Sequence, residues 1–167
     1  MTPAASKIPP TSRIARTLAC AATLALVALV AHAFPALAAP DLIVESLTLN
    51  PTTCANGTAV EITATIHNQG DSAADPSVTR IRINQDPATV GPDDTKLCSS
   101  LPTASLAPGA SIEVVCTPTI TGRPEGTNYV WAIADVNKEI GQVDTTNDRA
   151  PAALEVTAVQ ASDLIID

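Results

Sequence analysis

Aromatic residues and histidine are scarce in this sequence of 167 residues. It contains one Phe, one Trp, one Tyr and two His. Phe34 and His32 fall within an N-terminal leader, so the core of a folded domain must be built almost entirely from aliphatic side chains. The remaining histidine, His67, offers little material for a metal centre or a general base, and no Ser- or Cys-based catalytic motif accompanies it. An enzyme is therefore not expected.

Long apolar runs are also rare, and the one that occurs is too short for a membrane anchor. Residues 17–30 are uncharged and largely apolar, about 14 residues against the roughly 20 that a bilayer span needs. Three basic residues precede this run and an Ala-x-Ala sequence ending at Ala38 follows it, which is the layout of a secretory signal. We predict that residues 1–38 are a cleavable signal peptide, with cleavage after Ala38 rather than Ala33. The product would be secreted, periplasmic or on the cell surface, with no stable membrane span.

Basic residues are few once the leader is removed. The leader holds three of the nine Lys and Arg residues and none of the 17 Asp and Glu residues, which leaves a net charge of 6 − 17 = −11. Such an acidic chain is not expected to bind nucleic acid or anionic lipid surfaces. The mature length of 167 − 38 = 129 residues suffices for one domain with its own core, which we place at residues 39–160.

Helical periodicity is absent from the mature chain, whereas period-two alternation of apolar and polar residues recurs between turn signals. In the stretch AVEITATIH, for example, Val60, Ile62, Ala64 and Ile66 share one face. The alternating stretches are residues 59–67, 80–84, 111–117, 129–135 and 153–158. About seven short strands at this spacing indicate an all-β fold, an immunoglobulin-like antiparallel β-sandwich.

The first strand of the domain has two apolar phases. Leu42 and Val44 share one phase, whereas Leu47 and Leu49 occupy the other. A β-bulge, or a strand that changes sheets midway, would bring both pairs of side chains inward.

Four sequence motifs occur in the order found in CARDB domains, the cell-adhesion-related domains of bacteria. They are PDLIVESLTLNPTT, ITATIHNQGDSAA, SLAPGASIEV and YVWAIADVNKEIGQVDTTND, and the chain resembles this family over residues 40–159. The resemblance implies a sandwich of about seven strands, often in tandem copies on exported proteins. It also implies a non-catalytic structural or adhesion-related module. Its partner would be a protein or cell-surface component, or a neighbouring CARDB-like repeat.

The C-terminal residues repeat the sequence that opens the domain. Residues 163–167 (DLIID) match residues 41–45 (DLIVE) in kind at every position, at an offset of 163 − 41 = 122 residues. Residues 161–167 are therefore predicted to begin a second, truncated repeat. Alternatively, these residues extend the last strand of the same domain.

The acid- and amide-rich stretch that follows residues 129–135 is the sharpest candidate for a binding site. The CARDB pattern there can be written D-x-x-x-x-I-x-E-x-x-E-x-N-N. Asp135 and Asn147 match it, whereas Gln142 and Thr145 stand where the family usually has acids. Oxygen ligands at short spacing suit calcium, which takes roughly six to eight of them. The candidate ligands are Asp135, Asn137, Glu139, Asp144, Asn147 and Asp148.

Two interpretations of this stretch remain open. A soluble calcium- or polar-ligand-binding module using the loop between Asp135 and Asp148 is the alternative to the adhesion-related function. The other interpretation is a loop whose Asp and Asn side chains cap turns and bond the backbone. Apart from calcium, no cofactor is expected.

The mature chain keeps three cysteines, which in an oxidising compartment suggests one disulfide and one free thiol. Cys98 and Cys116 flank SLAPGA, a predicted hairpin turn in which Leu106 would face Ser111. The alternative pairing is Cys54 with Cys116. In immunoglobulin-like topology the second strand lies antiparallel to the fifth, so the start of one meets the end of the other. A chain without a disulfide is the third alternative.

The segment HNQGD at the end of the second predicted strand is expected to serve architecture rather than chemistry. Asn68 can satisfy turn amides, and Gly70 can adopt a positive φ at little cost. His67, by the alternation of its strand, is expected on the exposed face.

Overall fold

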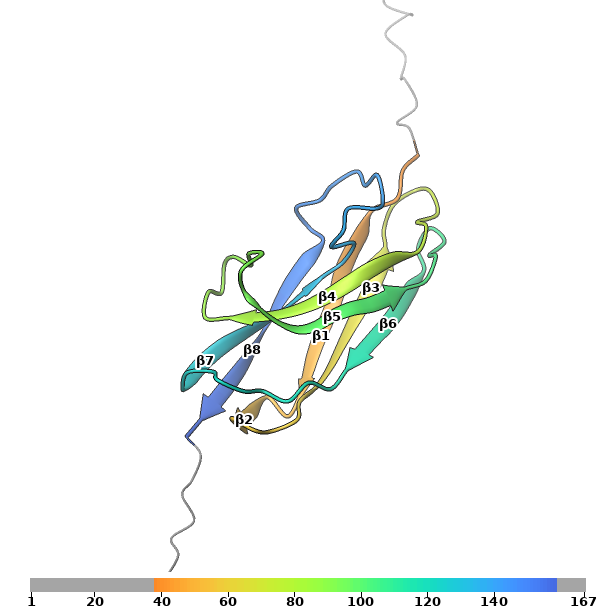
Figure 1. The fold of residues 1–167 in the computed structure, drawn as a ribbon. Coiled ribbons are helices and arrows are strands. Elements are labelled where there is room, and N and C mark those ends of the chain that lie inside the picture. The colour runs from red at the N-terminus through yellow and green to blue at the C-terminus, as the bar shows by residue number, and fades with distance from the viewer. Residues whose placement is uncertain (1–37, 159–167) are drawn as a thin grey trace, which may run out of the picture. The chain divides into compact units, whose positions relative to one another are not determined.

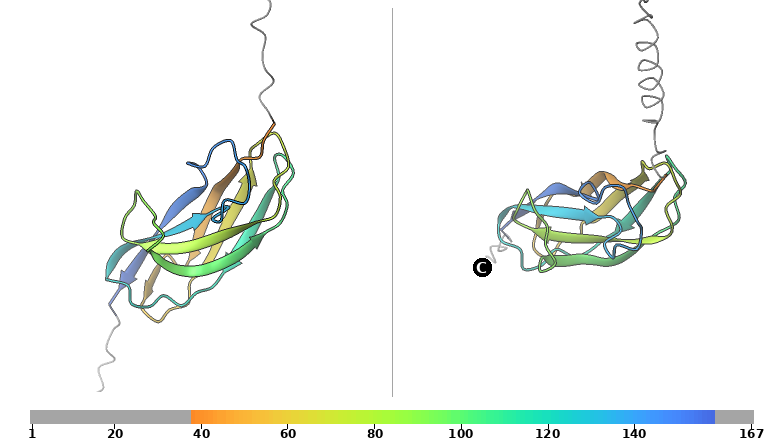
Figure 2. Two further views of the ribbon diagram at one scale, coloured as in Figure 1. Left: turned by 45° about the horizontal axis from the view of Figure 1, so that its top comes forward. Right: turned by 90° about the horizontal axis from the view of Figure 1, so that it is seen from above.

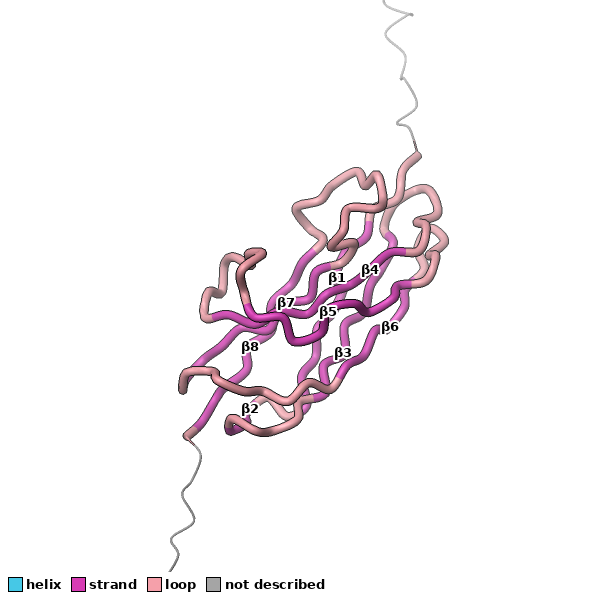
Figure 3. Tube along the Cα trace, viewed as in Figure 1, coloured by secondary structure: helices cyan, strands magenta, loops and turns pink. Residues whose placement is uncertain are grey.

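Residues 38–158 are described by a computed structural model of the chain, and they form two β-sheets joined by loops (Figure 1; Figure 3). The strands are β1 (Leu42–Asn50), β2 (Thr53–Ala55), β3 (Glu61–Asn68), β4 (Ser77–Asn84), β5 (Thr95–Thr103), β6 (Ser111–Cys116), β7 (Gly126–Ile133) and β8 (Arg149–Thr157). None of these residues forms a helix with the length and apolarity that a bilayer crossing requires. Residues 1–37 of the predicted leader and the predicted second repeat at residues 161–167 lie outside the described range.

The two sheets stack as a sandwich, which confirms the predicted fold class (Figure 2). One sheet has three antiparallel strands in the order β1-β3-β6, and the other has five in the order β2-β8-β7-β4-β5. The short strand β2 runs parallel to β8, while the remaining neighbours in the five-stranded sheet are antiparallel. The described chain enters at one end of the sandwich and leaves at the opposite end (Figure 1; Figure 2).

The core between the sheets is aliphatic, as the shortage of aromatic residues predicts. Ile62 and Ile66 of β3 face Ile81 and Ile83 of β4 in one buried cluster, and none of the four is exposed to solvent. Each such side chain contributes about 1.5–3 kcal/mol of hydrophobic free energy when it is fully buried. The alternation in the sequence thus selects the face of each strand that packs inward.

Strand β1 changes phase by a β-bulge, which is the first of the two predicted alternatives. Its antiparallel pairing with β3 shifts register between Val44 and Ser46, so Glu45 is an extra residue. Leu42 on one side of the bulge is fully buried, and Leu47 and Leu49 on the other side pack against the core. The bulge therefore lets both apolar phases of one strand face the same core.

A loop covers part of the outer face of the five-stranded sheet. Trp131 of β7 points away from the core, yet it is only 4% exposed. Its indole Nε1 donates to Asn84 Oδ1 at 3.2 Å and to the Asp86 carbonyl at 3.3 Å. Arg82 Nη1 donates to the carbonyl of Gly91 at 2.9 Å, and to those of two further residues of the same loop. The β4–β5 loop is thereby held over this face of the sheet.

The disulfide joins Cys98 of β5 to Cys116 of β6, but not across the hairpin that the sequence predicts. The prediction of a hairpin is wrong, because β5 pairs with β4 in one sheet and β6 pairs with β3 in the other. The connection instead crosses between the sheets, and its Leu106 is buried and bridges Ala74 rather than facing Ser111. Burial of Leu106 in the core accounts for the passage of the chain from one sheet to the other. Because Cys98 and Cys116 lie on either side of this connection, the disulfide links the two sheets.

The alternative pairing of Cys54 with Cys116 is not formed. Its topological premise holds, since β3 pairs with β6 and Ile62 lies opposite Cys116. However, Cys54 belongs to the short strand β2, where it pairs with Val156 of β8 in the other sheet, and its thiol is free and buried.

Asn68 ties together three segments at the end of β3. Its Oδ1 accepts hydrogen bonds from the backbone N–H groups of Asp41 and Gly70, both at 3.1 Å. Its Nδ2 donates to the carbonyls of Ser72 at 2.8 Å and Leu106 at 3.0 Å. The side chain is fully buried and satisfied, as its predicted role in the turn requires.

Gly70 is required for a different reason from the one predicted. A positive φ was expected, but Gly70 is not among the positive-φ glycines of the described residues. A Cβ at Gly70 would lie within 2.6 Å of the backbone of residues 39–41, far closer than van der Waals contact allows. The glycine therefore permits a close approach of two backbone segments at the start of β1.

Candidate functional site

The loop between β7 and β8, residues 134–148, contains all six predicted calcium ligands. Ile140 is 9% exposed and joins the core, which anchors the middle of the loop. The second half lies against the start of β1 (Figure 1), where Gln142 Oε1 accepts from the Leu42 N–H at 2.6 Å. Because the loop is anchored at these points, the six predicted ligands do not converge on one site. Some lie toward the two ends of the loop, and others lie beside the start of β1.

Asp135 caps the first half of the loop. Its φ is +40°, and its carboxylate accepts from the backbone N–H groups of Glu139 at 2.9 Å and Ile140 at 3.0 Å. The side chain is buried, whereas Asn137 and Glu139 are exposed. This geometry is the turn capping that the sequence offers as an alternative to metal binding, because both carboxylate oxygens already have partners.

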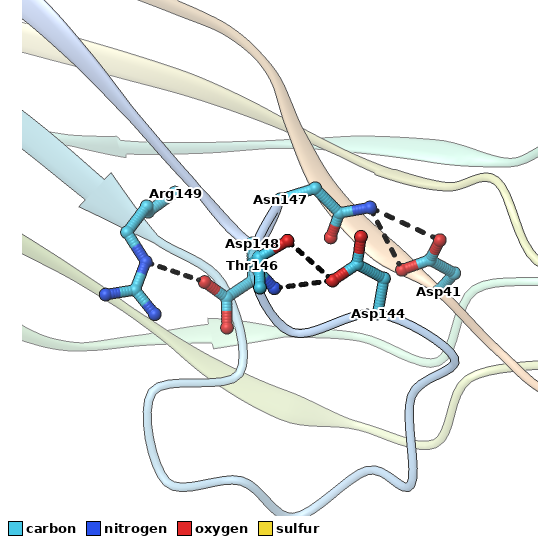
Figure 4. Close-up of polar contacts among 6 residues, drawn as sticks. All are labelled: Asp41, Asp144, Thr146, Asn147, Asp148 and Arg149. Carbon is cyan, nitrogen blue, oxygen red and sulfur yellow. Dashed lines mark hydrogen bonds and ion pairs between the residues drawn. The ribbon is translucent and has the colours of Figure 1, made fainter.

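Asp148, at the other end of the loop, turns toward Arg149 and away from Asn147 (Figure 4). It is 4% exposed, and Arg149 Nε donates to its Oδ1 at 3.0 Å. Burial raises the pKa of Asp148 above its usual value, and the adjacent Arg149 cation partly opposes this shift. Asp148 is therefore half of an ion pair in the structure.

The remaining two predicted ligands, Asp144 and Asn147, lie beside Asp41, the residue just before β1 (Figure 4). Asp144 Oδ1 accepts from both the backbone N–H and the hydroxyl of Thr146, at 2.7 Å each, and these bonds lower the pKa of Asp144. Asn147 Nδ2 donates weakly to the Asp41 carboxylate at 3.3 and 3.4 Å. The Oδ1 atom of Asn147 is buried and has no hydrogen-bond partner within residues 38–158.

Asp41 is not among the predicted ligands, because it lies 106 residues before Asn147 in the chain. Only the docking of the β7–β8 loop on the start of β1 brings the two side chains together. Asp41 is 7% exposed and also accepts from Gln69 Nε2 at 2.7 Å. The available signal was an acid directly before the apolar residues LIV that begin β1.

The side chains around Asp41 supply only part of what a metal site needs. Among residues 38–158, no three or more His, Cys, Asp or Glu side chains come together as a metal site would need. Asp41, Asp144 and Asn147 offer two carboxylates and one amide oxygen, which we call the Asp41 cluster. Calcium takes roughly six to eight oxygen ligands, so water would have to supply the rest. Calcium binding stays a prediction, with a changed ligand set.

The exposed face of the three-stranded sheet carries a second polar group. His67 Nδ1 lies 2.9 Å from Ser111 Oγ, and the Ser111 hydroxyl donates to Glu45 Oε2 at 3.2 Å. In a hydrolytic triad the histidine bonds both the serine and the acid. Here the serine lies between the other two, so the acid does not orient the imidazole.

The CARDB family model matches residues 39–151. The chain belongs to the CARDB family. Comparison with curated proteins found no match. Among solved structures, a CARDB domain from Pyrococcus furiosus in complex with di-metal ions is 20% identical, with a TM-score of 0.56 over 71% of this chain and 90% of that one. The metal ions belong to that protein, and at this identity the likeness shows the fold of this chain alone.

Two further solved structures resemble the sandwich of this chain. A domain of a protein assigned to the cell surface, from Methanosarcina acetivorans, is 22% identical, with a TM-score of 0.52 over 71% of this chain and 93% of that one. An alkylpurine DNA glycosylase from Pseudomonas fluorescens is 16% identical, with a TM-score of 0.50 over 71% of this chain but only 31% of the glycosylase. At these identities both likenesses show a shared fold alone.

Proposed function

We propose that the chain is an exported, non-catalytic CARDB module that acts as a structural or adhesion-related interaction domain of a surface or secreted protein. The observation that carries this proposal is the disulfide between the two sheets, Cys98–Cys116. Structural disulfides persist in oxidising compartments outside the cytoplasm, which agrees with the predicted signal peptide. Its partner is a protein or cell-surface component, and a neighbouring CARDB-like repeat is one candidate.

The shape of the sandwich supports a role in linking or presenting other parts of a surface. The described chain enters and leaves at opposite ends, which suits a module set in line with its neighbours (Figure 1). The loops at both ends and the outer strands remain for contacts, and binding residues are often carried by loops on a rigid scaffold. The serine-centred order of Glu45, Ser111 and His67 supports the non-catalytic part of the proposal.

Export is tested by producing the full chain with its own leader in a bacterial host and separating the cell fractions. We expect the protein outside the cytoplasm, beginning at Ala39 by mass spectrometry, with one free thiol per chain. A Leu26→Arg variant, which interrupts the apolar run, is the control and should stay inside the cell. Retention of the parent protein in the cytoplasm with all its thiols reduced would contradict the proposal.

The contact role is tested with beads coated with the secreted protein and mixed with whole bacterial cells. We expect the native protein to retain cells, and retention to fall when the cell surface has been treated with protease. Beads coated with reduced and alkylated protein are the control, because they carry the same charge without the sandwich. Equal retention by both kinds of bead would contradict an interaction role for the folded module.

A second candidate function is calcium binding at the Asp41 cluster. The specific observation that favours it is the buried, unpartnered Oδ1 of Asn147, which lies beside the Asp144 carboxylate, while the Nδ2 of the same side chain faces Asp41 (Figure 4). A cation there would bond this oxygen together with carboxylate oxygens of Asp41 and Asp144. With only two carboxylates the affinity should be weak, in the range of about 10⁻⁴–10⁻³ M that extracellular calcium modules show.

Thermal melting during a calcium titration tests this candidate. Calcium at ten times its dissociation constant should stabilise the parent by about 1.4 kcal/mol. The Asp144→Ala variant should lose this response. Asp86→Ala is a matched control, because Asp86 makes the same kind of turn bonds, to Ala88 and Thr89 in another loop. If both variants respond to calcium like the parent, the Asp41 cluster is not a calcium site.

A further inference from the structure

A depression of about 480 Å³ lies on the outer face of the five-stranded sheet, and none of the three residues of the Asp41 cluster lines it. Its floor includes Ile133 at the end of β7, and the β4–β5 and β7–β8 loops form its walls. The volume falls in the range of roughly 300–1,000 Å³ that is usual for small-ligand sites. Its charged lining residues are Arg80, Arg82, Lys138, Arg149, Asp135 and Asp148.

The depression gathers most of the positive charge of an acidic domain. Residues 38–158 contain six Lys and Arg against 15 Asp and Glu, a net charge of 6 − 15 = −9. Four of the six basic side chains line this one depression, together with only two acids, so its lining sums to +4 − 2 = +2. The sign of the charge is therefore reversed here relative to the rest of the surface.

Strand register brings two of the arginines to either side of the floor. Arg80 of β4 lies opposite Ile133 of β7, and Ile133 lies opposite Arg149 of β8. Neighbouring strands are about 4.8 Å apart, so the two arginines flank Ile133 across roughly 10 Å of backbone. Arg82, two residues along β4, shares the same face.

The outer basic side chains keep donors free for a ligand. Arg80 Nε donates to the Ser99 carbonyl at 3.1 Å, and Arg149 Nε donates to Asp148 at 3.0 Å. These bonds orient both guanidinium groups, while their terminal Nη atoms make no hydrogen bond within residues 38–158. The Nζ atom of Lys138 likewise has no such bond there. Arg82 differs, because its Nη1 is held by loop carbonyls.

The two acids of the lining are already engaged. Both oxygens of Asp135 accept backbone N–H groups, and Asp148 is paired with Arg149. Both acids are at least 96% buried, so the exposed part of the depression presents mainly cations. Their charges reduce the positive potential without removing it.

We propose that this depression binds a small dianionic oxyanion: sulfate, hydrogen phosphate or a dicarboxylate. A dianion neutralises the net charge of +2 in the depression. Guanidinium groups bind planar carboxylates and tetrahedral sulfate or phosphate groups through paired N–H donors. Arg80, Lys138 and Arg149 supply the contacts, and Arg82 supplies charge and a fixed wall. The site is independent of calcium binding and of the adhesion-related role.

The test is a titration of the secreted protein with sodium sulfate, phosphate or malonate, followed by NMR at amides 133–149 and arginine Nε–H groups. Sodium chloride at equal ionic strength is the reference. We expect saturable shifts with at least one dianion and none with chloride, and the tightest binder identifies the ligand class. Shifts that match those of chloride for all three dianions would overturn the proposal.

Variants separate a built site from general charge attraction. Arg149→Gln and Lys138→Gln should each weaken binding about tenfold, since a charge-assisted hydrogen bond is lost. Arg123→Gln and Lys96→Gln remove the same charges outside the depression and should bind like the parent. Lys138 is exposed, so its variant should keep the fold even if Arg149→Gln does not. Equal weakening by Lys138→Gln and Lys96→Gln would show attraction by charge alone and overturn the proposal.

Discussion

Cys98 of β5 and Cys116 of β6 are bonded between the outer strands of two different sheets. β5 is the last strand of the five-stranded sheet, and β6 is the last strand of the three-stranded sheet. The bond therefore fastens one long side of the sandwich. An aliphatic core without a large aromatic contribution gains from such a link, because the covalent bond restricts the unfolded chain rather than adding contacts.

Removal of the disulfide should lower stability substantially. The bond spans a sequence separation of 18 residues, for which the chain-entropy model gives about 3 kcal/mol. A Cys98→Ala/Cys116→Ala double variant should lose roughly that free energy of unfolding, measured by urea denaturation. Addition of a reductant should destabilise the parent but leave the double variant unchanged. A parent that is insensitive to complete reduction would contradict this prediction.

The third cysteine of the mature chain should react slowly. Cys54 is 5% exposed, and burial raises the pKa of its thiol. Since the thiolate is the reactive form, we expect alkylation by iodoacetamide at pH 8 to be at least about tenfold slower in the native protein than in guanidinium. Rapid labelling of the native protein would mean that β2 detaches readily from β8.

Replacement of Gly70 by alanine should destabilise the domain, because the new Cβ would meet the backbone of residues 39–41. We expect a loss of about 1–3 kcal/mol, typical of overpacking, in the free energy of unfolding. Gly141→Ala is the matched control, since nothing lies within 4 Å of a Cβ there. The control should change stability by less than about 0.5 kcal/mol. Similar urea midpoints for both variants would contradict the close approach at Gly70.

At pH 7 the fold should be less stable with Asp at position 148 than with Asn, the uncharged amide of the same shape. Burial raises the pKa of Asp148 in the folded state, so the folded state holds this proton more tightly than the unfolded chain does. Stability therefore falls as the pH rises from the ordinary carboxyl pKa through the raised one. Asp148→Asn should therefore unfold at higher urea than the parent at pH 7. The difference should vanish near pH 3, below the ordinary carboxyl pKa of about 3.9. Asp71→Asn removes one exposed carboxylate and is the control for the change in net charge.

The architecture of the sandwich was predictable because it depends on local alternation. The two phases of β1 predicted a bulge or a change of sheet, and the structure has a bulge between Val44 and Ser46. The alternation in residues 59–67 predicted which face of β3 is buried. The sequence did not predict β2, and it indicated β5 only as one arm of a hairpin with β6, whereas β5 pairs with β4. β2 has only three residues, and β5 (TKLCSSLPT) lacks a regular apolar alternation because it is the outermost strand of its sheet.

The candidate site was less predictable because it depends on contacts between distant segments. The six expected ligands share one loop, yet Asp135 caps a turn, while Asn147 points to Asp41, the residue before β1. The depression was likewise invisible in the sequence. Arg80 and Arg149 are 149 − 80 = 69 residues apart, and only the pairing of β4, β7 and β8 brings them to either side of Ile133.

The link between the sheets also sets how far the domain can be drawn out under tension. A pull on residues 38 and 158, at opposite ends of the sandwich, would bypass the segment between Cys98 and Cys116 (Figure 1). With the bond intact, about 18 residues never bear load, which shortens the fully stretched chain by roughly 60 Å. In an oxidising environment the domain would thus behave as a shorter tether than its length in residues suggests.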